Sequence, residues 1–439
     1  MIFPQPLLLL LCTAIPGFLI YVKKRTDLSI VWLALIIVCD IFNSQLYMNL
    51  AALLIFGMTV TPYLWFNRKD FYSNRAVQLL SIYFIYLVLL GIYHGFVLPW
   101  PDLSGVRSFK DQAQWRTILH LGRTVCEWFV VLFLVLEIER KPKQILSLFL
   151  RTMFFASIAL AMSALLEKAL QIDFYHFFTR GRALLLPDRP RGFAYEPRGL
   201  SQNLAYAMLL TPFVPLPRWK YFFVPLFAFV AIYFTISFSG IAVLVSGLIL
   251  LGILFPISHL EFIRRNLKSA SGVCLAVMVV LAISISALPK SSLHHMHVRL
   301  DYLFDSGVAE KLEVFDAASV NFLDHHPKYY LLGTGPGLIY LPAGDYILER
   351  DKYIWNNHFE ALPHLGAVLI ISNSGLLGLC IFILILGIGG AKKRKTAPIL
   401  FVIGFLIMGI FMIQIRYFYI LGMACLLVRN QPLREEALT

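Results

Sequence analysis

The segment Arg180–Asn203 reads RGRALLLPDRPRGFAYEPRGLSQN and separates two apolar stretches of the chain. It is strongly basic, with five arginines and only two acidic residues: Arg180, Arg182, Arg189, Arg191, Arg198, Asp188 and Glu196. The topology derived below places it outside the cytoplasm, where arginine is disfavoured in membrane proteins. Because planar guanidinium groups suit phosphate oxygens, the segment predicts an anionic partner there. The alternative is a basic loop that lies on anionic lipid head groups.

The composition of the whole chain predicts a helical membrane protein. Of its 439 residues 59% are hydrophobic and only 14% are charged, which leaves too little polar surface for a soluble fold of this length. Apolar runs of about 17–25 residues recur from end to end, as in polytopic helical proteins. The net charge of +13 sits in short clusters between these runs, so we set nucleic acid aside as a partner.

We expect an all-α bundle of about 12–13 membrane spans that forms one integral membrane domain over residues 1–439. The expected spans cover roughly 6–22, 28–45, 48–66, 77–98, 115–136, 145–166, 204–216, two spans within 221–257, one that ends near 288, 364–388, and two within 397–428. Span ends read from a sequence are good only to a few residues.

Basic clusters set the expected orientation of this bundle. If each apolar run crosses once, the clusters all fall on one side, which the positive-inside tendency makes cytoplasmic. Residues 99–114, the arginine-rich loop 171–203 and the segment 289–363 then face outward. The segment 289–363, between spans ten and eleven, is long for a connector, and Val308–Leu323 has amphipathic helical spacing. We therefore expect short helices within this large outer loop.

A polar stripe runs along the expected span 115–136. Arg116, His120, Arg123 and Glu127 are spaced four, three and four residues apart, which stacks them on one helix face. An arginine that faces lipid at the bilayer centre costs about 2.5–3.5 kcal/mol, so we expect the stripe to face the protein interior. Two interpretations stay open: the stripe lines a cavity, or an Arg123–Glu127 ion pair locks the bundle.

Glu196 and Pro197 stand just before the expected span 204–216. Proline favours the first turn of a helix, so we expect a helix N-terminus here, and such an end attracts anions. A carboxylate that stays ionised beside this end can accept a proton. The alternative role for Glu196 is an ion pair with Arg191 or Arg198.

The histidines of the later part of the chain have poor spacing for a metal site. The run His294–His297 lacks the helical spacing and the glutamate partner of a zinc protease. We therefore expect neither a metal nor another cofactor. His364 opens the expected span 364–388 at the outer surface, where it either meets a substrate or lies at the membrane interface. The glycine-rich run Gly333–Gly337 lacks the lysine of a P-loop and is interpreted as a turn.

Three motifs, in this order, resemble those of the polysaccharide polymerase and O-antigen ligase superfamily of bacterial inner-membrane glycosyltransferases. Arg191–Pro197, RGFAYEP, is similar to the arginine–glycine–phenylalanine–x–x–Glu–Pro stretch of exopolysaccharide polymerases. Phe322–Pro327, FLDHHP, with Gly333–Gly337 behind it, resembles the loop that precedes the family's functional histidine. His364, followed by Gly375–Gly378, resembles that histidine and its glycine pair.

The chain departs from the family pattern at several positions. His358, in the sequence NNH, is a rival for the role of His364. The family often has Ser-Arg at the turn between two paired spans, where this chain has Ser237 followed by Phe238. Leu365 follows His364, where the family commonly has asparagine. An arginine contact is therefore expected from elsewhere in the chain, and the candidates are Arg116, Arg123 and Arg299.

The resemblance implies a metal-independent glycosyl transfer at the outer face of the bacterial inner membrane, from a glycan on undecaprenyl diphosphate. Arginines would stabilise the diphosphate leaving group, and a carboxylate or imidazole would take the proton of the acceptor hydroxyl. The candidate diphosphate-binding residues are Arg189, Arg191, Arg198, Arg116, Arg123 and Arg299. The candidate bases are Glu196, His364 and His358.

Within this superfamily the Glu-Pro form of the arginine stretch favours a polymerase that joins lipid-linked repeat units. The alternatives are an O-antigen ligase, which moves the glycan to lipid A–core, and a transporter or flippase of the same lipid-linked anion. The expected partners are the undecaprenyl-diphosphate-linked glycan, membrane lipid and a protein that regulates chain length.

Overall fold

The computed structural model describes residues 14–38, 48–72, 74–102, 111–171, 190, 192, 197–211, 214–231, 314–347, 363 and 365–391. Within these residues all regular secondary structure is helical, as the sequence predicts. In chain order the helices are η1 (Phe18–Val22), α2 (Thr26–Val38), α3 (Met48–Phe66), α4 (Arg68–Tyr72), α5 (Arg75–Ile92), η3 (Tyr93–Val97), α6 (Ala113–Arg140), α7 (Pro142–Leu170), α9 (Pro197–Leu210), η6 (Arg218–Phe222), α10 (Phe223–Phe229), α15 (Val314–His325), α16 (Lys328–Leu332), α17 (Tyr340–Ala343), η8 (Gly344–Tyr346) and α19 (Gly366–Ala391).

Four helical stretches are long and apolar enough to cross a membrane, and each overlaps an expected span: Val77–Val97, Ala113–Arg140, Gln144–Leu170 and Gly366–Ile385. Two shorter apolar stretches, Thr26–Ile36 and Ile55–Phe66, overlap two further expected spans. The total of about 12–13 spans stays a prediction, because the remaining expected spans lie wholly or partly outside the described residues.

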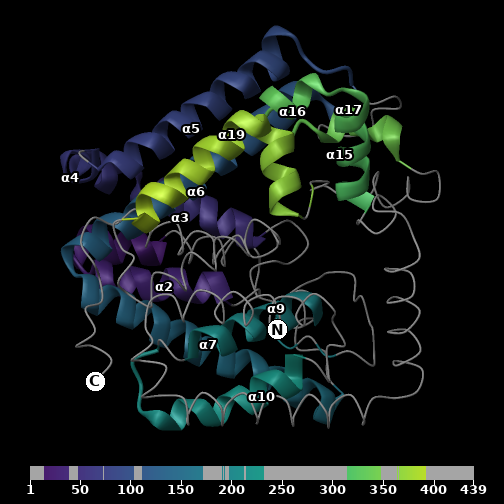
Figure 1. The fold of residues 1–439 in the computed structure, drawn as a ribbon. Coiled ribbons are helices and arrows are strands. Elements are labelled where there is room, and N and C mark those ends of the chain that lie inside the picture. The colour runs from purple at the N-terminus through teal and green to yellow at the C-terminus, as the bar shows by residue number, and fades with distance from the viewer. Residues whose placement is uncertain are drawn as a thin grey trace.

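The helices pack as two neighbouring groups joined by α6 and α7. Figure 1 shows α5 and α19 side by side, and α3 packs along α6. In the second group α7 contacts α2, α9 and α10. The run Val130–Leu136 of α6 is buried on every side, and a helix that is apolar all round belongs inside a bundle. There Phe133 meets Phe56 edge to face, with ring centroids 5.6 Å apart.

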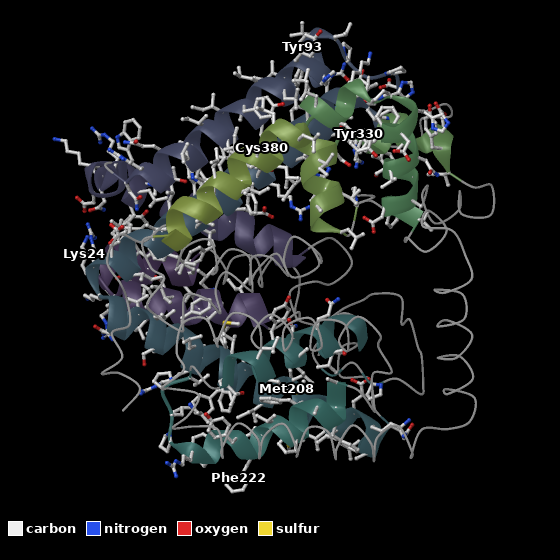
Figure 2. The ribbon with its side chains drawn as sticks, viewed as in Figure 1. Lys24, Tyr93, Met208, Phe222, Tyr330 and Cys380 are labelled. Carbon is white, nitrogen blue, oxygen red and sulfur yellow. The ribbon has the colours of Figure 1, made fainter. Side chains whose placement is uncertain are left out.

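One end of the bundle gathers three of the basic clusters. Arg140, at the end of α6, donates a hydrogen bond of 2.8 Å to the carboxylate of Asp70, which follows α3. Glu137, one turn earlier, accepts a hydrogen bond of 2.5 Å from Thr26 at the start of α2. The basic clusters before α2, after α3 and after α6 therefore share one end, which Lys24 marks in Figure 2. That this end is cytoplasmic stays a prediction.

The opposite end carries residues 314–347, which contain the short helices α15, α16, α17 and η8. The amphipathic helix expected over Val308–Leu323 is described from Val314 and ends at His325. Tyr330 marks this end in Figure 2, away from the basic clusters. Trp100, just beyond η3, donates its indole N–H to the carbonyl of Thr334 at 3.3 Å. The segment is therefore tied to the ends of the membrane-length helices.

Candidate functional site

Helix α6 carries the polar stripe that the sequence predicts. The side chains of Arg116 and Arg123 are buried, with residue exposures of 1% and 6%, so both point into the protein as expected. Both belong to a helical stretch long enough to cross a membrane. Charged groups in that position are costly and are found with polar partners or at functional sites. The contacts of each arginine therefore decide what the stripe can do.

Arg123 forms an ion pair with Glu127. Its Nε lies 3.1 Å from Oε1 of the carboxylate, one helical turn further along α6. The ion pair expected from the spacing is thus present. It joins two turns of the same helix, however, so this bond neutralises charge within the stripe and does not itself link α6 to a neighbouring helix.

Arg116 holds a loop in place. Its Nε donates a hydrogen bond of 2.8 Å to the carbonyl of Gly337, and its guanidinium carbon lies 4.0 Å from the centre of the Tyr340 ring. The Tyr340 hydroxyl donates in turn to Asp111 at 3.2 Å. Burial raises the pKa of Tyr340, and the Asp111 carboxylate raises it further, so the phenol stays protonated at neutral pH. Arg116 is therefore engaged by protein groups on at least two sides.

The glycine-rich run Gly333–Gly337 is a packed loop and does more than turn the chain. Its three glycines, Gly333, Gly335 and Gly337, all have positive φ, at 80°, 95° and 72°. A Cβ on Gly337 would overlap the ring of His120. A phosphate cradle needs free N–H groups, but those of Gly335 and Gly337 donate to the backbone carbonyl and the side chain of Asn373. The N–H groups of the loop are therefore used in contacts with Asn373 and do not form a phosphate cradle, as expected of a segment without the P-loop lysine.

The partner of this loop is a break in α19. Gly375 has a φ of 66° inside the helix, which interrupts the regular hydrogen bonding. The backbone carbonyl of Ser372 accepts hydrogen bonds from the N–H and the hydroxyl of Thr334, at 2.7 and 2.8 Å. The carbonyl of Ser374 accepts one from the Tyr86 hydroxyl at 3.3 Å. The sequence showed the glycine pair Gly375–Gly378 but not the break; the signal was the polar run SNSG within an apolar span.

A contact that the sequence did not reveal joins Gly192 of the arginine-rich segment to α7. Gly192, in the RGFAYEP motif, donates its N–H to Oε2 of Glu167 at 2.7 Å. Its φ is 56°, and a Cβ would lie 2.8 Å from the backbone nitrogen of Ala164. A carboxylate is disfavoured at a helix C-terminus unless it has such a donor. Glu167 in the last turn of an apolar span was the available signal.

These features share the end of the bundle opposite the basic clusters. α6 and α7 are joined by the single residue Lys141, contact each other, and both extend away from the turn at that residue. Arg123 and Leu160 each lie about 26 Å of helix from that turn. A Cβ on Gly192 would lie 3.2 Å from the carbonyl of Leu160. The stripe and the contact of Gly192 therefore lie at similar distances from the turn at Lys141, each on its own helix.

The other predicted site residues have less structural support. α9 begins at Pro197, as the sequence predicts, which puts Arg198 in its first turn. The remaining candidates lie outside the described residues: Arg189, Arg191, Glu196, Arg299, His358 and His364. Within the part of the chain that is described, no group of three or more histidine, cysteine or acidic side chains is placed to hold a metal ion.

Comparisons with known proteins do not assign the site. No protein-family model matches the chain, and no curated protein matches it. The function therefore has to be argued from the residues and their arrangement.

Proposed function

We propose that the protein is a polysaccharide polymerase, a glycosyltransferase that joins glycan repeat units carried on undecaprenyl diphosphate. One observation carries the proposal: buried Arg116 and Arg123 lie on a membrane-length helix at the end where the RGFAYEP motif is anchored. When the glycosidic bond to a diphosphate breaks, the leaving group gains negative charge. Arginines in a water-poor site stabilise that charge without a metal, at about 1.5–3 kcal/mol for each charge-assisted hydrogen bond.

Within the stripe the two arginines have different roles in this proposal. Arg116 is held by Gly337 and Tyr340 and positions the glycine-rich loop. Arg123 forms an ion pair with Glu127 along the same helix and is the candidate contact from α6. Arg189, Arg191, Arg198 and Arg299 are the further candidates.

The acceptor hydroxyl needs a base, and the candidates are Glu196, His364 and His358. If Glu196 is the base, Glu196→Gln removes transfer but leaves donor binding, since the amide keeps the shape and loses the proton acceptor. His364→Ala then lowers activity by a smaller factor. If a histidine is the base, activity falls on acidification toward its unperturbed pKa of about 6.5. Purified protein with a synthetic lipid-linked repeat unit separates these outcomes, and full turnover by Glu196→Gln removes it from the mechanism.

The proposed site faces outward from the bacterial inner membrane. The support is that three basic clusters share one end and the stripe lies toward the other. Cysteines placed at Ser104 or Ser291 are expected to react with an impermeant thiol reagent in intact spheroplasts. A cysteine placed at Lys393 is expected to react only after lysis. The reverse pattern would put the arginine segment in the cytoplasm and would exclude the proposed donor site.

Glycan analysis in a deletion strain separates the polymerase from the ligase. A missing polymerase leaves single repeat units at the cell surface and no long chains, whereas a missing ligase leaves long chains on the carrier lipid. A protein that regulates chain length is the expected protein partner of the polymerase.

A transporter or flippase of the same lipid is the second candidate, and the break in α19 favours it. Transporters use interrupted helices at their binding sites, where freed backbone groups meet the substrate. Here the carbonyls of Ser372, Asn373 and Ser374 accept hydrogen bonds from Thr334, Gly335 and Tyr86. These bonds hold the glycine-rich loop on α19, which supports a structural role for the break over a substrate-binding one. Movement of a labelled lipid across proteoliposomes without chain extension would select the transporter.

A further inference from the structure

Helix α16 changes character along its length. It starts at Lys328, whose ammonium lies 4.9 Å from the centre of the Tyr329 ring. It ends at Leu331 and Leu332, which are 59% and 49% exposed. Single exposed leucines are ordinary on protein surfaces. Whether water or lipid contacts this pair therefore depends on its position along the membrane-length helices.

A hydrogen bond fixes that depth. The Tyr86 hydroxyl donates to the carbonyl of Leu332 at 2.6 Å. Tyr86 belongs to the membrane-length stretch Val77–Val97 and lies about 15 Å of helix before its end. A tyrosine side chain cannot reach across that length, whichever way it points. Leu332 therefore lies inside the limits of a membrane span and not above its end.

The break in α19 gives an independent measure of depth. A Cβ on Gly375 would overlap the carbonyl of Leu331, so the end of α16 lies directly against the break. The next two residues of α19, Leu376 and Leu377, are 43% and 44% exposed and belong to the apolar stretch Gly366–Ile385. Leu331 and Leu332 thus end α16 against the break, Leu376 and Leu377 follow the break in α19, and we call these four residues the leucine patch.

The backbone around the patch suits an environment without water. Non-helical backbone at membrane depth is tolerated where protein groups satisfy its N–H and C=O groups. The N–H of Gly333, which follows α16, donates to Tyr329 at 2.8 Å, and the carbonyl of Leu332 accepts from Tyr86. The N–H of Thr334 donates to Ser372 of α19. These three backbone groups at the end of α16 are therefore paired with protein groups.

We infer that α16 re-enters the bilayer and that the leucine patch contacts lipid acyl chains. The sequence places α16 in a large aqueous loop, whereas its apolar end continues the lipid-facing surface of α19. Lys328 stays at the water side of the same short helix, as long basic side chains do at membrane interfaces. The inference does not depend on the proposed reaction, because it rests on the depth and exposure of the leucines alone.

Thiol accessibility in proteoliposomes tests this inference. Leu331→Cys and Leu332→Cys replace exposed side chains, so the fold tolerates them. Asp345→Cys, at an exposed residue of η8, is the aqueous control, and Leu89→Cys, at an exposed residue of the membrane-length stretch Val77–Val97, is the lipid-facing control. Reaction with an impermeant maleimide, measured above that of the parent with its six native cysteines, should be at least about tenfold slower at Leu331→Cys than at Asp345→Cys. Both should react equally in a denaturing detergent.

A second readout identifies what covers the patch. A bimane attached at each position is compared in vesicles with and without brominated acyl chains. Quenching by brominated lipid is expected at Leu331→Cys and at the control Leu89→Cys but not at Asp345→Cys. Equal maleimide rates at Leu331→Cys and Asp345→Cys would show that α16 is in water and would overturn the inference. Slow labelling without quenching by brominated lipid would show that protein covers the patch, which would overturn it as well.

Discussion

The two ends of α6 hold arginine in different ways. At one end Arg140 donates to the Asp70 carboxylate and lies near Glu137, so acidic groups offset its charge. Toward the other end Arg116 meets the carbonyl of Gly337 and the ring of Tyr340, and both of these partners are neutral. The first end is therefore built as a clamp between helices, whereas at the second end Arg116 holds a loop in place beside the proposed site.

The largest expected effect is on stability, at the Arg140 end. Glu137 is 2% exposed and accepts hydrogen bonds of 2.5 Å from both Thr26 and Tyr63. Glu137→Ala leaves these two hydroxyls without their shared acceptor and removes the carboxylate that lies 3.8 Å from Arg140. Removing one member of a buried charged network costs about 3–5 kcal/mol, and we expect a loss of that size in the free energy of unfolding, measured by denaturant titration in detergent micelles.

The matched control for Glu137→Ala is Asp70→Ala. The Asp70 side chain is 52% exposed, so the loss of its bond to Arg140 should cost at most about 1 kcal/mol. The transfer rate per folded molecule should be unchanged in both variants. Loss of transfer by folded Glu137→Ala protein would mean that both ends of α6 serve the reaction. The interpretation of the Arg140 end as a purely structural clamp would then be wrong.

The second effect is on activity, at the other end. Arg123→Ala should lower the transfer rate by about a hundredfold, in the range seen when one oxyanion-stabilising donor is removed. Arg123→Lys should restore only part of it, because an ammonium lacks the planar fork of a guanidinium. The measurement is chain extension by purified protein on a lipid-linked repeat unit.

Glu127→Gln separates a role in the reaction from a role in the fold. It breaks the ion pair of 3.1 Å but leaves the guanidinium of Arg123 in place. If Arg123 contacts the diphosphate, Glu127→Gln should retain most of the activity that Arg123→Ala loses. Equal losses in the two variants, with matching losses of folded protein, would reduce the stripe to a structural ion pair.

Periodicity and hydropathy predicted the helices well because they reflect whether each helix face contacts the protein interior, lipid or water. The spacing of Arg116 and Arg123 predicted an interior stripe, and Pro197 predicted a helix start; both features are present. The amphipathic pattern of Val308–Leu323 located α15 in the same way. These signals are local in the chain, so a single sequence contains them.

Contacts between distant segments were harder to predict. The bond from Gly192 to Glu167 and that from Arg116 to Gly337 join residues far apart in the sequence. The break at Gly375 depends on the hydrogen-bond donors of a distant loop, which replace those of a regular helix. Hydropathy averages over such a break, because SNSG is short within its apolar surroundings.

The third prediction concerns the anchor of the arginine-rich segment, which has a smaller expected effect. Glu167→Ala removes the acceptor of the Gly192 N–H, a bond of 2.7 Å to a charged group. Such a bond contributes about 1.5–3 kcal/mol, so we expect the transfer rate to fall by roughly tenfold as the motif loses its fixed position. Glu167→Gln keeps an acceptor oxygen and should recover most of the rate. No recovery by Glu167→Gln would show that the charge of Glu167, and not its position, matters.

The smallest expected effect tests whether the burial of a cation, Lys220, lowers the free energy of unfolding. Lys220 lies in η6, between α9 and α10. It is 7% exposed, and its ammonium donates a hydrogen bond of 2.6 Å to the carbonyl of Val214. Burial lowers its pKa from 10.5 to about 8. Between these values the unfolded chain binds the proton and the folded protein does not, so stability should rise as pH increases from about 8 to about 10.5. Below about pH 8 Lys220 is charged in both states, and the full penalty of burying the charge remains.

The variant Lys220→Met removes this titration, so the Tm of the parent should rise relative to that of Lys220→Met between about pH 8 and about pH 10.5. If the Tm of the two proteins changes with pH in the same way, the burial of Lys220 does not reduce the stability of the fold.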